Sequence, residues 1–218
     1  MKTKQLIFFA IFSVLGFITL QIPFTKLAGS NVSFTLFDFF GPISGAFLGS
    51  AFGVLSVLGI EIINLLIKHT SLTTGVLIRL FPVLFALLYF SLIQKKNNYS
   101  KLILLVPILA ILAFWANPVG KQVWYFALFW TIPLIAYFKR NNLLIKSLGS
   151  TFTAHSVGGA AWIWAFNLPA SIWQGLIPVV IEERTLFALG IAGSYLVMKQ
   201  LLNFLTHKNL LPKSFLPA

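Results

Sequence analysis

The sequence contains no cysteine, so disulfide bonds and thiolate metal sites are excluded. Charged side chains are also scarce: they make up 9% of the 218 residues, where a soluble domain would carry about a quarter. Hydrophobic residues make up 58% of the chain, more apolar surface than a water-soluble core of this size could bury. The composition therefore predicts an all-α integral membrane protein that crosses the bilayer several times.

The sequence motifs of many enzymes and channels are also missing. There is no Walker motif, no GxSxG nucleophile elbow and no HExxH sequence. Carboxylate or histidine pairs at metal spacing, an arginine ladder and a potassium-filter sequence are lacking too. We therefore expect no catalytic residue, no metal site and no cofactor. A membrane protein that binds a small molecule needs only a dry pocket with a few polar groups, and this class remains.

The net charge of +12 does not indicate a nucleic-acid partner, because the basic residues lie in short clusters between apolar runs. Such clusters are typical of the cytoplasmic loops of membrane proteins, where they also attract anionic lipid. The clusters are Lys2 and Lys4; Lys95, Lys96 and Lys101; Lys139, Arg140 and Lys146; and Lys199, Lys208 and Lys213. We expect the lipid bilayer as the partner of these charges, in the cell membrane, with both termini cytoplasmic.

The apolar runs and the clusters together predict eight membrane segments. They are 5–22, 37–52, 54–68, 74–94, 102–116, 122–138, 147–166 and 184–205. One helix from Leu36 to Ile67 would be about 48 Å long, well beyond a hydrocarbon core of about 30 Å. Splitting it near Gly53 also puts all four basic clusters on one side. We expect a polytopic helical bundle of six to eight segments, some short or broken, in one membrane domain (1–205) with a short basic cytoplasmic tail (206–218).

Residues 168–181 are interrupted by proline and glycine, which makes them a poor membrane span. We expect this stretch to lie along the outer interface, with Trp173 as an interfacial anchor.

Small residues recur at helical spacing in two stretches. Gly41, Gly45, Gly49 and Gly53 follow one another at every fourth position and would stack on one helix face, and Ala10, Ser13 and Gly16 form a lesser stripe. In lipid, small residues at this spacing let two helix backbones approach closely. Packing within the fold explains both stripes, and so does a ligand or a partner helix seated on that face.

The chain has only four acidic residues, and all of them lie inside or at the end of an apolar segment: Asp38, Glu61, Glu182 and Glu183. A carboxylate in a membrane costs roughly 2.5–3.5 kcal/mol, so it usually faces a cavity or a partner. Asp38 could instead satisfy free amides at a helix start, and the two later glutamates could serve helix-end electrostatics. Glu61 lies one turn before Asn64, deep in apolar sequence, where capping does not explain it. A binding site or an internal ion pair would explain the position of Glu61.

Arg79 is the arginine that we expect well inside a span. It could pair with Glu61, or it could bind an anionic group in bidentate fashion. Thr73 and Thr74 would add hydroxyl groups at the start of the same helix.

His155 lies in the middle of a span, followed by the small pair Gly158 and Gly159. It could bridge two helices, or it could face a cavity with Trp162 and Trp164 as apolar walls. The full set of substrate-binding candidates is Asp38, Glu61, Asn64, Thr74, Arg79, His155 and Trp162.

The first 100 residues combine several features in order. An apolar span and a polar linker lead to an acid before a short apolar segment with the turn FGPISGAFLG, from Phe40 to Gly49. The stretch INLLIKHTSLTTG, from Ile63 to Gly75, and a proline-bearing span follow, up to a lysine-rich loop. This order resembles the substrate-capture (S) components of energy-coupling-factor vitamin transporters. The resemblance implies a helical subunit that binds a vitamin or a related molecule near the outer face. It also implies that a transmembrane coupling subunit and two ATPase subunits drive transport.

The sequence thus predicts a substrate-binding subunit of a small-molecule uptake transporter, and not an enzyme. Two alternatives stay open. A structural or assembly membrane protein would use the glycine faces for partners and would have no pocket. An intramembrane enzyme would need His155 within reach of Glu182 or Glu183 for acid–base chemistry.

Overall fold

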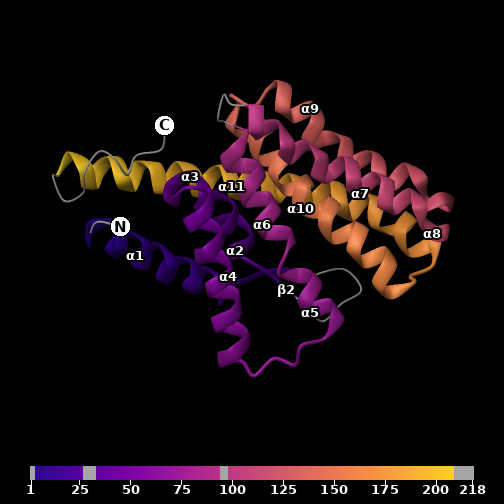
Figure 1. The fold of residues 1–218 in the computed structure, drawn as a ribbon, viewed down its shortest axis with the longest axis horizontal. Coiled ribbons are helices and arrows are strands. Elements are labelled where there is room, and N and C mark those ends of the chain that lie inside the picture. Colours follow the sequence, from indigo (N-terminus) through magenta and orange to yellow (C-terminus); the bar gives the residue numbers. More distant parts are fainter. Residues whose placement is uncertain (1–2, 27–32, 94–97, 209–218) are drawn as a thin grey trace.

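A computed structural model describes residues 3–26, 33–93 and 98–208 of the chain (Figure 1). Within these ranges the structure is a bundle of helices, which confirms the predicted helical architecture. The exception in the same ranges is an antiparallel pair of short strands, β1 (Pro23–Lys26) and β2 (Ser33–Thr35). The sequence analysis treats this stretch as a polar linker and does not predict the strands.

The helices follow one another through the chain as a series of long and short elements. They are α1 (Thr3–Leu20), α2 (Phe37–Phe40), the 3₁₀ helix η1 (Gly41–Ile43), α3 (Ser44–Leu48), α4 (Ser50–Ile67), α5 (Thr74–Arg79), α6 (Pro82–Leu92), η2 (Asn98–Leu104), α7 (Leu105–Ala116), α8 (Pro118–Gln122), η3 (Trp124–Thr131), α9 (Ile132–Phe138), α10 (Leu143–Phe166) and α11 (Ala170–His207). Two helical stretches, Ser50–Ile67 and Thr74–Leu92, are long and apolar enough to cross a membrane.

Side-chain caps and prolines mark the starts of several helices. The Asn142 side chain accepts a hydrogen bond from the Ile145 amide at the start of α10, and Thr73 caps α5 in the same way. Pro82 and Pro118 stand in the first turns of α6 and α8, where the missing amide hydrogen costs nothing.

The apolar run from Leu36 to Ile67 is split, as predicted, but the break is at Gly49 and not near Gly53. Gly49 has φ 82° and ψ 154°, a backbone conformation that is essentially restricted to glycine. This residue ends α3 and precedes α4, so one continuous glycine face does not exist. The expectation that the four glycines stack on one helix is therefore wrong.

The break turns the glycines into a contact between helices. A Cβ added at Gly53 of α4 would lie 2.8 Å from the Cα of Gly45 on α3, so the two backbones touch. Gly45 also contacts Leu87 and Ser91 on α6, and Gly41 contacts Val83 on α6. Close helix packing thus accounts for Gly41, Gly45 and Gly53.

The lesser stripe on α1 also packs within the fold, apart from its first member. Ser13 Oγ lies 2.7 Å from Ser56 Oγ on α4, and Gly16 lies under the side chain of Ile60. Ala10, in contrast, is exposed.

The prediction for residues 168–181 is wrong. These residues lead into and form the first part of α11, a helix of 38 residues that runs through most of the length of the molecule (Figure 1). Trp173 is only 3% exposed and packs edge-on against Phe114 and Phe126, so it is not an interfacial anchor. The sequence analysis took Pro178 as a helix breaker, whereas membrane helices tolerate proline when neighbouring groups satisfy the freed carbonyl.

Helix α11 joins two packed groups of side chains. Its C-terminal half packs with α1, α3 and α6 through residues such as Phe12, Phe47 and Leu202. Its N-terminal half packs with α7, η3 and α10 through residues such as Phe114 and Trp130. The molecule therefore has an N-terminal and a C-terminal part that meet along α6, α10 and α11.

We expect Gly53→Ala to lower the melting temperature of the detergent-purified protein by several degrees. The new methyl group would press on the backbone of α3, which cannot rotate away, and overpacking of this kind costs about 1–3 kcal/mol. Gly59→Ala is the matched control, because Gly59 is on the same helix and has no atom within 4 Å of an added Cβ. Equal melting temperatures of the two variants would contradict the close α3–α4 contact.

Candidate functional site

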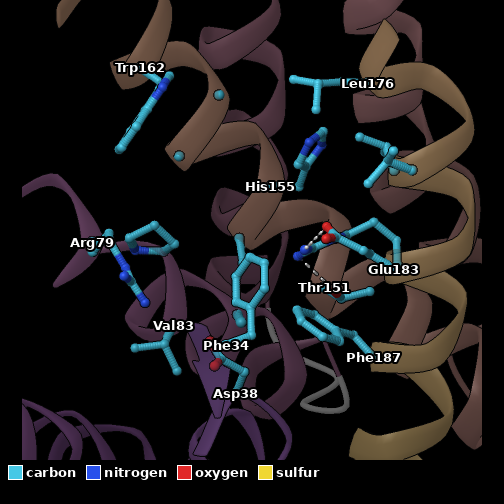
Figure 2. Close-up of a pocket in the computed structure, with 18 of the residues that line it drawn as sticks. Phe34, Asp38, Arg79, Val83, Thr151, His155, Trp162, Leu176, Glu183 and Phe187 are labelled. Atoms are coloured by element: carbon cyan, nitrogen blue, oxygen red, sulfur yellow. Dashed lines mark hydrogen bonds and ion pairs between the residues drawn. The ribbon is translucent and has the colours of Figure 1, made fainter. Parts of the chain in front are cut away.

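A cavity of about 490 Å³ lies between the two parts of the molecule. Figure 2 shows side chains that line it from both parts. The lining residues that this site depends on are Phe34 of β2, Asp38 of α2, Arg79 of α5 and Val83 of α6 on one side, and Thr151, His155 and Trp162 of α10 with Glu183 and Arg184 of α11 on the other.

Aromatic rings make up much of the wall of this cavity. They come from elements far apart in the sequence: Phe34, Phe126, Trp162, Phe166, Trp173 and Phe187. Most of the remaining lining is aliphatic or glycine, and the charged groups are few. Pockets of this size and character, largely apolar with a few polar groups, are typical sites for small molecules.

An ion pair lies on the α11 side of the cavity. Arg184 Nη2 donates to Glu183 Oε2 at 3.2 Å, and the two side chains are only 6% and 14% exposed. Arg184 Nη1 donates to Thr151 Oγ1 on α10 at 3.4 Å, and its guanidinium carbon lies 4.2 Å from the centre of the Phe187 ring. In an apolar surrounding an arginine needs such partners, so this pair links α10 to α11 and carries its own counter-charge.

The opposite side of the cavity holds Asp38 and Arg79, and both bind the backbone of the β2 region. Asp38 Oδ2 accepts a hydrogen bond from the Thr35 amide at 2.8 Å. Arg79 Nη2 donates to the Ser33 carbonyl at 3.2 Å. Asp38 thus satisfies an amide just before α2, as its position near a helix start suggests, and it lines the cavity as well. The two charges hold Phe34 of β2 at the cavity wall.

Glu61 does not line the cavity, and it does not form the predicted ion pair with Arg79. In the described ranges the ion pair that forms is the one between Arg184 and Glu183. The Oε2 atom of Glu61 is buried without a hydrogen-bond partner among the described residues.

Asn64 and Thr74 also lie outside the cavity. Asn64 Oδ1 accepts a hydrogen bond from Gln21 Nε2 at 3.0 Å, which links α4 to the end of α1. Thr74 is exposed in the first turn of α5. Neither residue joins Arg79 in the cavity wall, although the sequence analysis expects both there.

His155 lies in the cavity wall and is oriented by a tryptophan. Trp130 Nε1 donates to His155 Nδ1 at 2.9 Å, so Nδ1 carries no proton and the ring proton is on Nε2. Among the described residues no carboxylate lies within ion-pair distance of His155, and Glu183 is paired with Arg184 instead. The pair that the intramembrane-enzyme alternative requires is therefore not formed.

The two tryptophans expected as pocket walls differ. Trp162 lines the cavity, and its ring packs against the ring of Phe166 in a tilted arrangement, with ring centres 4.2 Å apart. Trp164 is 54% exposed and donates to the Ala113 carbonyl, so it faces away from the cavity. No three histidine, aspartate or glutamate side chains in the described ranges come together as a metal site would require.

The sequence analysis missed the Glu183–Arg184 pair as part of the site. It starts the last span at residue 184, gives helix-end electrostatics as one explanation of Glu183, and does not consider Arg184. The available signal was an arginine between the apolar runs of PVVIEERTLFALG. Arg184 becomes recognisable as a charge inside a helix once that helix is known to begin at Ala170.

The fold and the cavity define a helical, largely apolar protein with an internal pocket of the size that small molecules occupy. The chain matches the family described as "ECF transporter, substrate-specific component" over residues 4–183, and it therefore belongs to this family. The match extends well beyond the first 100 residues, which alone carry the resemblance in the sequence.

One relative is an uncharacterised protein of Methanocaldococcus jannaschii. It is 24% identical over 216 residues, which cover 90% of this chain and 71% of the relative. No solved structure matches this chain. The family makes the chain an integral membrane component of a transporter.

Proposed function

We propose that this protein is the membrane-embedded substrate-binding subunit of an uptake transporter for a vitamin-like small molecule, and that the cavity between its two parts holds the substrate. The observation that carries the proposal is the cavity itself. It has the volume and the aromatic lining of a small-molecule site, in a chain that belongs to a family of substrate-specific components. The alternative of a structural protein without a ligand does not explain a cavity of this size and lining.

Energy for uptake would come from other subunits. The chain has no Walker motif with which to bind a nucleotide. In the proposed assembly a transmembrane coupling subunit and two ATPase subunits supply that function, as the family description of a substrate-specific component supports.

The proposed orientation puts both termini in the cytoplasm and the cavity toward the outer face. The basic cluster at Lys139, Arg140 and Lys146 supports a cytoplasmic loop between α9 and α10. The loop between α4 and α5 would then be external, and α5, which brings Arg79 to the cavity, begins directly after that loop.

The site is tested by filling it. A Cβ at Gly158 meets only Pro82 Cγ at 3.5 Å, so Gly158→Leu should fold and extend its side chain into the cavity. Native mass spectrometry of the protein purified from its own host should show a bound small molecule on the wild type and at least a tenfold lower occupancy on this variant.

Gly193→Leu is the matched control. Gly193 is on α11, is exposed, has no atom within 4 Å of an added Cβ and does not line the cavity. This variant should keep the bound molecule. Wild-type protein without any bound molecule, or equal occupancy on both variants, would contradict the proposed site and favour the structural alternative.

The orientation is tested with single cysteines, which report alone because the natural chain has none. Asn141→Cys, in the exposed loop between α9 and α10, should resist a membrane-impermeant maleimide in intact cells. Ser71→Cys, exposed between α4 and α5, should react. Permeabilised cells give the full labelling of each variant as the control. Any other pattern in intact cells overturns the proposed orientation.

A further inference from the structure

Two hydrogen-bond donors on the α10–α11 side of the cavity have no acceptor in the described part of the chain. Arg184 Nε is buried without a partner, although both terminal nitrogens of the same guanidinium are bonded. His155 carries its ring proton on Nε2, because Nδ1 accepts from Trp130. Both residues line the cavity.

Both donors belong to residues next to Thr151. Arg184 bonds to Thr151, and Thr151 is one helical turn before His155 on the same face of α10. Figure 2 shows His155, Thr151 and Glu183 together on one side of the cavity, with Arg79 and Asp38 on the other. Nearer the start of α11, Trp173 Nε1 is another buried donor without a described partner, and Trp173 also lines the cavity.

Two acceptors on this side bind the terminal nitrogens of Arg184 and not its Nε. Glu183 Oε2 and Thr151 Oγ1 both accept from Arg184. Buried donors are costly when unpaired, so donors without an acceptor in the wall of a ligand-sized cavity are explained if the ligand provides the acceptor.

We propose that the substrate presents an acceptor oxygen, from a carbonyl or a carboxylate group, to Arg184 and His155, while its planar or apolar body lies between the aromatic walls. This inference rests on the proposed substrate-binding function. It makes Arg184 the residue that selects for the acceptor group. Because Glu183 already balances the charge of Arg184, a neutral carbonyl and a carboxylate share the chemistry that the site requires.

The test uses two sets of three compounds that differ only in the acceptor group. They are nicotinate, nicotinamide and 3-methylpyridine, and indole-3-acetate, indole-3-acetamide and 3-ethylindole. Dissociation constants are measured with the detergent-purified full chain by calorimetry. For at least one set, we expect the acid or the amide to bind at least tenfold more tightly than the alkyl compound. A tighter acid identifies a carboxylate, and an equal or tighter amide identifies a carbonyl.

The variant that tests Arg184 is Glu183→Gln with Arg184→Gln, since the double change leaves no unpaired charge in the membrane. The preference for the acceptor compound over the alkyl compound should fall to less than threefold, while the alkyl affinity stays the same. A merely structural role of Arg184 would weaken both compounds together. Arg140→Gln, which removes an arginine outside the cavity, should keep the full preference.

Equal binding of acceptor and alkyl compounds by the wild type overturns the inference and leaves the small-molecule site in place. An unchanged preference in the double variant overturns the role of Arg184. Absence of binding for all six compounds also overturns the inference. The proposed substrate-binding function is then tested separately, by the native mass spectrometry of the protein from its own host.

Discussion

The close contact between α6 and α10 is the constraint on which the rest of the structure depends. Gly149 of α10 leaves room for the ring of Tyr89, whose hydroxyl donates to the Pro133 carbonyl at 2.6 Å. One residue further, Ser150 Oγ donates to the Ala86 carbonyl of α6 at 2.8 Å. Lipid gives little hydrophobic force between helices, so small residues and buried hydrogen bonds must hold them together. This contact joins the two parts of the molecule and fixes the walls between which the cavity opens.

The cavity combines apolar walls with charged side chains that each have a bonding partner. Two acids and two arginines line it, so their formal charges cancel. On one side Asp38 and Arg79 hold the backbone before α2, and on the other Arg184 is held by Glu183. Charges without partners would be costly at this depth, and these bonds make the charged side chains compatible with a membrane. A site of this kind suits the capture of a molecule that is mostly apolar and has one polar end.

The positions of His155 and of the glycines argue against the two alternative functions, an intramembrane enzyme and a structural membrane protein. An intramembrane enzyme needs an acid next to His155, and in the described ranges that histidine bonds to Trp130 instead. A structural protein needs its glycine faces for partners, whereas Gly41, Gly45 and Gly53 are consumed by contacts among α3, α4 and α6. Membership of the family of substrate-specific components agrees with the remaining class, a subunit with a cavity between its two parts.

The sequence by itself determined the class of protein, and it picked out Asp38, Arg79, His155 and Trp162, which the structure places in the cavity wall. Composition and hydropathy can do this because they report the cost of moving each segment from water into lipid. Only the tertiary structure decided the break at Gly49, the true start of α11, the absence of a Glu61–Arg79 pair and the pairing of Arg184 with Glu183. These depend on which helix faces which, a relation between residues far apart in the chain. Hydropathy carries no information about it, because a charge that is paired across two helices and one that is left alone look the same in sequence.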